Sequence, residues 1–495
     1  MSDAKPLDGA LLSGLGWTAV LRWTSAVVSW AATLFVARLL VPGDYGLIAM
    51  ATIPIGLVRM VEDFGLDAIL VQDRSIVGTR QAQLGGFILG LGATLTTITL
   101  LLARPIAAFF NEPQIMGLIS LLSLLFLADA LQVVPRAELQ RKLRFRRLAA
   151  LVLIQVAATQ TILLAAALAG FGAWSLAISN VAGVAVVTLV LWIWEPHPIH
   201  WPSGLRDLAK PLLQGWRVMA SRFAYYAYAT SDQTIIGRML GKDALGSYSF
   251  VLTFSALPFQ EVSSVITKVV PGIFSEVQHR TEELRRYFLL LTELMAFLTL
   301  PMTVGLALTA DLLVRAALGP NWSAVAVPLQ VMCGYAAFQG MQILISPILV
   351  WTGQFRAQMW CAILTGVSLP LGFLLASPYG LVAIAVVWSV LYPLTNVPPV
   401  LIGLRTVRVS VWQWLETARP AACACALMAV AVIGVRSATS SHGELFRLGA
   451  AVAVGAVVYT AAVWFLFRAR VTALIDVVKR ARARPSAPPS LAAPA

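Results

Sequence analysis

The chain contains fourteen apolar runs, each long enough to cross a lipid bilayer as a helix. A hydrocarbon core of about 30 Å needs about 20 such residues. Only 12% of the 495 residues are charged, against roughly 25% in soluble domains. The sequence therefore predicts an all-α membrane protein with about 14 transmembrane helices. The runs cover residues 13–40, 47–72, 82–103, 115–135, 149–170, 172–194, 213–240, 247–271, 287–311, 323–351, 357–376, 379–402, 417–436 and 445–467.

Lysine and arginine are distributed unevenly between alternate loops. If the N-terminus is cytoplasmic, the inner loops and ends hold 25 of these residues and the outer loops hold 7. Cytoplasmic loops of membrane proteins carry an excess of this kind. The count favours fourteen crossings with both termini in the cytoplasm. It also accounts for the net charge of +13 through contact with anionic lipid, so the charge does not indicate a nucleic-acid partner.

The sequence contains an internal repeat. Residues 37–48 (ARLLVPGDYGLI) match residues 237–248 (GRMLGKDALGSY) at an offset of 200, which also places Arg22 on Arg222. Both segments follow outward-running helices, so the repeat is parallel, with an axis along the membrane normal and a site between the halves. We therefore expect two six-helix lobes followed by two helices. The boundaries are 1–12 (cytoplasmic N-terminus), 13–194 (N-lobe), 195–212 (cytoplasmic linker), 213–402 (C-lobe), 417–467 (last two helices) and 468–495 (basic, then disordered cytoplasmic tail).

Two arginines lie inside apolar runs at matched places in the repeat. An arginine at the centre of a membrane helix costs about 2.5–3.5 kcal/mol, so it usually faces water or a partner. Each one begins a polar stripe along its helix. The first stripe is Arg22, Ser25, Ser29 and Thr33, and the second is Arg222, Tyr225, Tyr226 and Gln233. We expect both stripes to line a central cavity; the alternative is that each arginine pairs structurally with an acid.

A third buried cation, Arg59, lies three and four residues before Glu62 and Asp63. That spacing allows a local ion pair, which competes with a substrate-binding role for Arg59. The second half also contains buried acids at Asp232, Glu261 and Glu293. One of them could couple transport to an ion gradient, with Asp232 the first choice, or each could pair with an arginine.

The segment from Pro135 to Leu148 (PRAELQRKLRFRRL) interleaves apolar side chains with six cations. It is typical of an interfacial segment on the anionic inner leaflet, either as a topology anchor or as a contact for an anionic lipid head group. Signals for catalysis and for cofactors are absent from the sequence. The four histidines lie in loops without a third ligand nearby, so we expect neither a metal site nor a catalytic residue.

Several motifs resemble a known family: ARLLVPGDYGLIAMA (37–51), EDFGL (62–66), the basic loop at 135–149, FGAWSLA (171–177), SDQTIIGRMLGKDALGSYSF (231–250) and PGIFSEVQ (271–278). They are similar to those of the polysaccharide transporter family, the Wzx-type and colanic-acid-exporter-like flippases of the multidrug/oligosaccharidyl-lipid/polysaccharide (MOP) superfamily. The likeness covers about the first 400 residues.

The resemblance implies a two-lobed carrier with alternating access in the bacterial inner membrane. It would move an undecaprenyl-pyrophosphate-linked oligosaccharide from the inner to the outer leaflet, alongside a polysaccharide polymerase and export machinery. Arg22, Arg59 and Arg222 would then be the cavity cations for the pyrophosphate, since arginine suits bidentate phosphate contacts. Tyr225 and Tyr226 would stack on sugar rings or pack against another helix.

Three other interpretations remain open. A multidrug or cation extruder of the same superfamily would need an acidic cavity for cationic drugs. A membrane-bound saccharide polymerase or ligase would need an essential carboxylate outside the membrane, and the outer loops carry only Asp44, Glu112, Asp243 and Glu444. A purely structural membrane protein gives no reason for buried cations at matched places in two halves.

Overall fold

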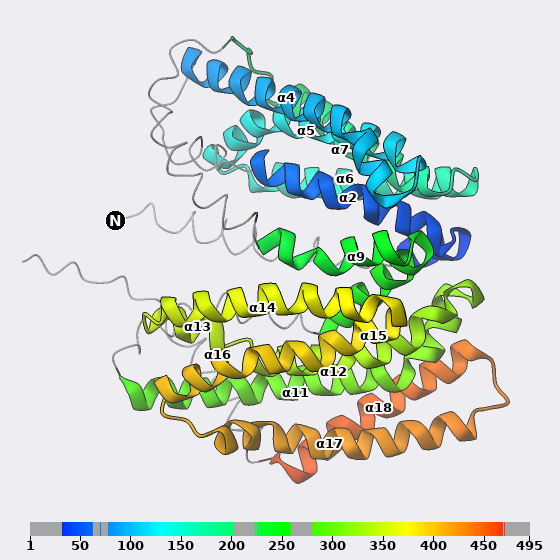
Figure 1. The fold of residues 1–495 in the computed structure, drawn as a ribbon, viewed down its shortest axis with the longest axis vertical. Coiled ribbons are helices and arrows are strands. Elements are labelled where there is room, and N and C mark those ends of the chain that lie inside the picture. The colour runs from blue at the N-terminus through cyan, green and yellow to red at the C-terminus, as the bar shows by residue number, and fades with distance from the viewer. Residues whose placement is uncertain are drawn as a thin grey trace, which may run out of the picture. The chain divides into compact units, whose positions relative to one another are not determined.

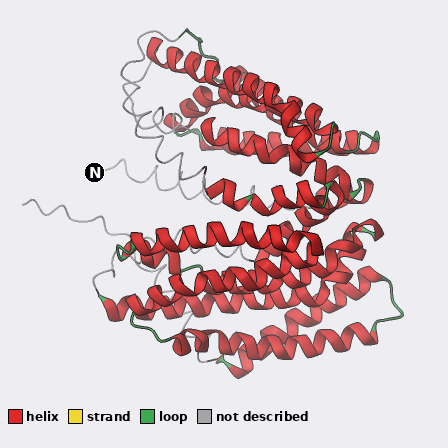
Figure 2. Cartoon of the chain, in the orientation of Figure 1, coloured by secondary structure: helices red, strands yellow, loops and turns green. Residues whose placement is uncertain are grey.

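The computed structural model describes residues 32–62, 70, 78–201, 223, 225–258, 280–468 and 470. Within these ranges the chain is helical and has no strand (Figure 2). Eleven of the described helical stretches are long and apolar enough to cross a membrane. They coincide with eleven of the runs expected from the sequence, so the prediction of an all-α membrane protein is confirmed. The other three runs extend beyond the described residues, and the count of fourteen stays a prediction.

The chain divides into two compact units. The first comprises residues 1–250, 317–325 and 370–384. Its long central helix is α5, which lies among α2, α4 and α7 (Figure 1). The elements of this unit are α2 (Pro42–Glu62), α4 (Thr79–Phe110), α5 (Gln114–Arg141), α6 (Phe145–Leu168), α7 (Ala173–Trp194), α9 (Ser231–Met239) and the 3-10 turns η3 (Pro320–Val325) and η4 (Ser377–Tyr379). Residues 32–39 and 242–250 are also helical, and the latter helix continues to residue 258 in the second unit.

Helix α5 is central because its apolar side chains point in several directions. Ile115, Leu118, Ile119 and Phe126 are fully buried, as expected of a membrane helix that neighbouring helices surround. The preceding helix, α4, ends at Asn111, which adopts the left-handed conformation (φ 57°) of a helix C-cap. The loop that follows is short, so α4 and α5 pack as antiparallel neighbours.

The second unit comprises residues 251–316, 326–369 and 385–495. Helix α11 packs against α12, α17 and α18, and the last two form a hairpin along it (Figure 1). Arg436 of α17 pairs with Asp311 of α11 at 2.6 Å, and the Tyr459 hydroxyl of α18 donates to the Phe297 carbonyl at 2.8 Å. The helices here are α11 (Thr281–Leu313), η2 (Val314–Leu318), α12 (Ala326–Gln342), α13 (Ile345–Trp351), α14 (Phe355–Ala376), α15 (Leu381–Val386), η5 (Val387–Leu391), α16 (Tyr392–Thr406), α17 (Val411–Ala438) and α18 (Glu444–Leu466). The bounds of η2, α14 and α15 extend into the first unit.

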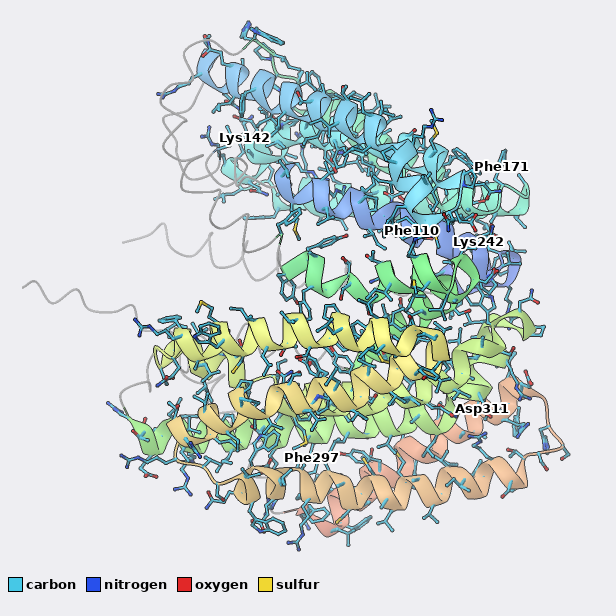
Figure 3. The ribbon with its side chains drawn as sticks, viewed as in Figure 1. Phe110, Lys142, Phe171, Lys242, Phe297 and Asp311 are labelled. Carbon is cyan, nitrogen blue, oxygen red and sulfur yellow. The ribbon has the colours of Figure 1, made fainter. Side chains whose placement is uncertain are left out.

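Successive loops of the first unit lie at opposite ends of its helices. Figure 3 places Phe110, Phe171 and Lys242 at one end and Lys142 at the other. We name these the Asp44 end, because Asp44 accepts a hydrogen bond from the Ala173 backbone there, and the Glu195 end, because Glu195 pairs with Lys142 there. This alternation is what repeated crossing of a membrane requires.

Candidate functional site

Arg59 forms an ion pair with Asp129 of α5. The sequence spacing suggested a local pair with Glu62 or Asp63, and the partner from α5 was not foreseen. The side chains are 45% and 29% exposed, so the pair is not fully buried. Asp129 reduces the cost of placing Arg59 in a membrane helix. One sequence signal pointed to Asp129: it is the single acid within the apolar run 115–135.

Several of the expected site residues fall outside the described part of the chain: Arg22, Ser25, Ser29, Arg222 and Glu261. Thr33, the last member of the first polar stripe, is helical and half-buried. The proposed pairing of the two stripes in one cavity therefore stays a prediction.

The two tyrosines of the second polar stripe differ in how far they are buried against other helices. Tyr225 is 68% exposed, and its ring contacts that of Tyr228. The Tyr226 hydroxyl donates to the Ile53 carbonyl of α2 at 3.1 Å, and a Cβ on Gly56 would overlap this hydroxyl. Tyr226 therefore packs against another helix, one of the two roles expected for it, whereas a sugar-stacking role for Tyr225 stays a prediction.

Asp232 is deeply buried at the start of α9, with 2% exposure. It accepts a hydrogen bond from the Tyr248 hydroxyl at 2.7 Å, and its other oxygen accepts one from the Gln233 backbone at 2.7 Å. Gln233 itself is half-buried. A carboxylate at such a depth needs partners of this kind, because burying it without them is costly.

Glu293 of α11 pairs with Arg470 at 2.8 Å, with 15% of its side chain exposed. Of the two roles expected for Glu293, the structure shows the arginine partner. The described candidates thus meet separate neighbours: Arg59 with Asp129, Asp232 with Tyr248, and Glu293 with Arg470.

At the Asp44 end, the two copies of the sequence repeat contact each other. A Cβ on Gly46 would overlap the carbonyl oxygen of Lys242, and a Cβ on Gly246 would overlap that of Pro42. The offset of 200 exchanges Pro42 with Lys242 and Gly46 with Gly246, so the two contacts are the same contact made twice. The backbones approach this closely only because both helix starts carry glycine. Both copies thus begin at the same end of the first unit, and the two six-helix lobes expected from the sequence stay a prediction.

Further contacts surround the paired glycines at this end. The matched cations Arg38 and Arg238 both reach the ends of other helices: Arg38 donates to the Ala317 carbonyl at 2.9 Å, and Arg238 lies over the Phe109 ring at 5.8 Å. Lys242 pairs with Glu112 at 3.2 Å. Trp322 is 1% exposed and donates its indole N–H to the Ala37 carbonyl at 2.9 Å. Apolar and charged contacts thus hold these helix ends together at the Asp44 end.

An apolar cavity of about 520 Å³ lies between α2, α4 and α9. Its lining carries no charged side chain, and its polar groups are the hydroxyls of Thr230, Ser231 and Thr234. It does not suit a charged head group. In the described part of the chain, no group of three His, Cys, Asp or Glu residues is arranged to hold a metal ion.

These features define a multi-pass helical membrane protein whose two repeats meet at a glycine-lined contact. A family model described as "Polysaccharide biosynthesis protein" matches residues 35–327, and the chain belongs to that family. Among its relatives is the lipopolysaccharide biosynthesis protein WzxC of Escherichia coli, 24% identical over 65% of this chain and 66% of the relative. The succinoglycan biosynthesis transport protein ExoT of Rhizobium meliloti is 24% identical over 97% of both chains.

Two solved structures share the fold. The lipid II flippase MurJ in an inward closed conformation matches with a TM-score of 0.72 and 13% identity, over 92% of this chain and 99% of its own. An inward-facing MATE multidrug transporter of the MOP superfamily matches with a TM-score of 0.61 and 13% identity, over 79% of this chain and 98% of its own. The fold is therefore the one that these two structures share, and the family model confirms the polysaccharide biosynthesis family expected from the motifs.

Proposed function

We propose that the protein is a flippase for an undecaprenyl-pyrophosphate-linked oligosaccharide. It would move this lipid from the inner to the outer leaflet of the bacterial inner membrane, for the synthesis of an exopolysaccharide, capsule or O-antigen. The alignment with ExoT carries the proposal, because it runs over 97% of both chains and ExoT is named as a transport protein of polysaccharide biosynthesis.

The physical problem in this reaction is the head group. A pyrophosphate and its sugars cannot cross bare hydrocarbon, because burying their charge and hydroxyls is prohibitive. In our proposal Arg22, Arg59 and Arg222 provide a cationic path, and the exposed Tyr225 stacks on sugar rings. Arg59 would exchange Asp129 for a phosphate oxygen, which its 45% exposure permits. No covalent bond breaks, so the protein would act without catalytic residues.

The contact between Gly46 and Gly246 would serve as the outer gate. With both termini cytoplasmic, the Asp44 end faces outward, and its closure corresponds to a state that opens inward. Alternating access then requires the helix starts at 42–46 and 242–246 to separate. A buried acid would couple this step to an ion gradient; Asp232 is the best placed, because it is buried and bonded to Tyr248 of the next helix.

Two other functions remain as alternatives, and the proteoliposome experiment described below tests both of them. The MATE transporter shares the fold with a TM-score of 0.61, which favours a multidrug extruder as the first alternative. A saccharide polymerase or ligase is the second. If the protein is a flippase, a polysaccharide polymerase and export machinery would be its partners and would act on the flipped lipid-linked oligosaccharide.

The deciding experiment uses proteoliposomes that contain the full chain and a fluorescent lipid-linked oligosaccharide. A membrane-impermeant lectin or reductant reports the fraction of label in the outer leaflet. We expect wild-type protein to expose the label and Arg59→Gln to lose most of this activity. Efflux of a cationic dye without flipping would favour the multidrug alternative. Growth of the glycan in the same vesicles would favour the polymerase.

A further inference from the structure

Three cations converge on one carboxylate at the Glu195 end. Lys142 reaches one Glu195 oxygen at 2.7 Å, Arg147 reaches the other at 3.0 Å, and Arg144 pairs with that second oxygen as well. Glu195 is 10% exposed and directly follows α7. Lys142 and Arg144 lie in the turn between α5 and α6, and Arg147 lies in the first turn of α6. In the sequence, Glu195 is only the first residue of the expected linker 195–212, and nothing there indicates that it gathers this cluster.

The cluster retains unused capacity for an anion. An arginine has five N–H donors, and the geometry uses one from Arg144 and one from Arg147 for Glu195. The three cations are 43–44% exposed, and Lys142 also pairs with Glu138 at 3.0 Å. Three cations against two carboxylates leave an excess positive charge. The two carboxylates that face the cluster, those of Glu138 and Glu195, therefore do not balance its three positive charges.

Apolar side chains stand between the cations. Leu143 is 60% exposed and Phe145 is 48% exposed. Leu143 also has φ of +52°, a left-handed conformation that a bulky residue rarely adopts. Arg147 lies 5.7 Å from the centre of the Trp194 ring. Alternating cations and exposed apolar groups of this kind suit the boundary between head groups and acyl chains rather than open solution.

We propose that Lys142, Arg144 and Arg147, held by Glu195, bind the phosphate of an anionic phospholipid. Arg144 and Arg147 present planar guanidinium groups, which match phosphate oxygens in pairs. Lys142 adds a point charge, and Leu143 and Phe145 contact the acyl region. Glu195 fixes the cations in place before the lipid arrives, so that less ordering remains to be done on binding. The site does not depend on the proposed transport function.

The test measures lipid binding by thermal stabilisation of the purified full chain in detergent. A ligand that binds the native state raises its stability as its concentration exceeds Kd. Titration with dioleoylphosphatidylglycerol should raise the melting temperature, and titration with dioleoylphosphatidylcholine should not. Arg144→Gln should raise the apparent Kd by roughly fivefold or more, the effect of one cation at a membrane surface. Its melting temperature without lipid checks that it folds.

Arg146→Gln is the matched control, because it removes the same charge from the same turn but from a residue outside the Glu195 cluster. It should change the apparent Kd by less than about twofold if binding is local, since exposed charges are screened by salt. Equal losses in Arg144→Gln and Arg146→Gln would leave only diffuse attraction and overturn the site. A third titration uses geranylgeranyl pyrophosphate. If Arg144→Gln weakens this ligand more than phosphatidylglycerol, the site belongs to the transported lipid and the phospholipid assignment fails.

Discussion

Gly46 and Gly246 occupy equivalent positions in the two repeats, and each abuts a backbone carbonyl of the other repeat. The carbonyls belong to Lys242 and Pro42, which the same offset of 200 exchanges. A side chain at either glycine would enter space that the carbonyl occupies. The contact thus imposes a local two-fold relation on the helix starts, and it can be broken from either side.

Gly46→Ala should therefore force the two helix starts apart. Overpacking of this kind costs about 1–3 kcal/mol. We expect a lower melting temperature in detergent and a reduced flipping rate, because the proposed outer gate no longer closes. Gly246→Ala should have the same effect, since its Cβ meets the Pro42 carbonyl in the same way.

The control for both changes is Gly434→Ala in α17, where an added Cβ meets nothing within 4 Å. Alanine is favoured over glycine inside a helix by roughly 0.5–1 kcal/mol. This variant should melt at the same or a slightly higher temperature and flip normally. If Gly46→Ala behaves like Gly434→Ala, the glycine contact does not hold the Asp44 end together.

A charge exchange separates the two roles of Arg59. The double variant Arg59→Asp with Asp129→Arg restores the ion pair in the opposite order, so it should fold with a melting temperature near that of wild type. If Arg59 also contacts the pyrophosphate, flipping should stay at least tenfold below wild type. Recovery of both stability and flipping would assign Arg59 a purely structural role. Each single variant, measured alongside, gives the cost of an unpaired charge.

Much of the fold could be predicted from the sequence, because apolar length alone specifies a membrane helix. Helices α5 and α7 appear within a few residues of the expected runs 115–135 and 172–194. The repeat of residues 37–48 at residues 237–248 was also recognised from the sequence. Both predictions depend on local sequence, which needs no knowledge of how the helices rotate against one another.

Pairing between helices could not be predicted in the same way. Arg59 has acids three and four residues later, yet it pairs with Asp129, 70 positions away. The choice depends on which faces of α2 and α5 meet, and packing decides that. Glu195 was missed for the same reason: its three partners come from the α5–α6 turn and the start of α6, which reach it only in the folded chain.

Asp232→Asn should remove the dependence of flipping on an ion gradient, if the buried acid couples transport. The amide keeps the shape of the side chain and can still bond to Tyr248, but it cannot lose or gain a proton. We expect at least a tenfold lower rate with an imposed proton or sodium gradient, and no change without one. Glu444→Gln, at the exposed start of α18, is the matched control. Unchanged gradient dependence in Asp232→Asn would remove this residue from the mechanism.

The Glu195 cluster should give the protein a defined pH dependence of stability. The hydrogen bond between Lys142 and Glu195 is the main cause of two pKa shifts. It lowers the pKa of Glu195 below 4.5, and it raises the pKa of Lys142 above 10.5. The Glu195 contribution is complete above pH 4.5 and is lost as pH falls through its folded-state pKa. The stability that Lys142 contributes is complete below pH 10.5 and is lost as the pH rises through the folded-state pKa of Lys142.

Melting temperatures measured in detergent from neutral to acidic pH check this dependence. Glu195→Gln should melt below wild type at neutral pH, because three cations lose their shared carboxylate. The difference should shrink as the medium becomes acidic, because the wild-type carboxylate then takes up a proton as well. Glu444→Gln should follow the wild-type curve throughout. If the difference in melting temperature between wild type and Glu195→Gln stays constant down to the lowest pH measured, the charge on Glu195 does not stabilise the α5–α6 turn.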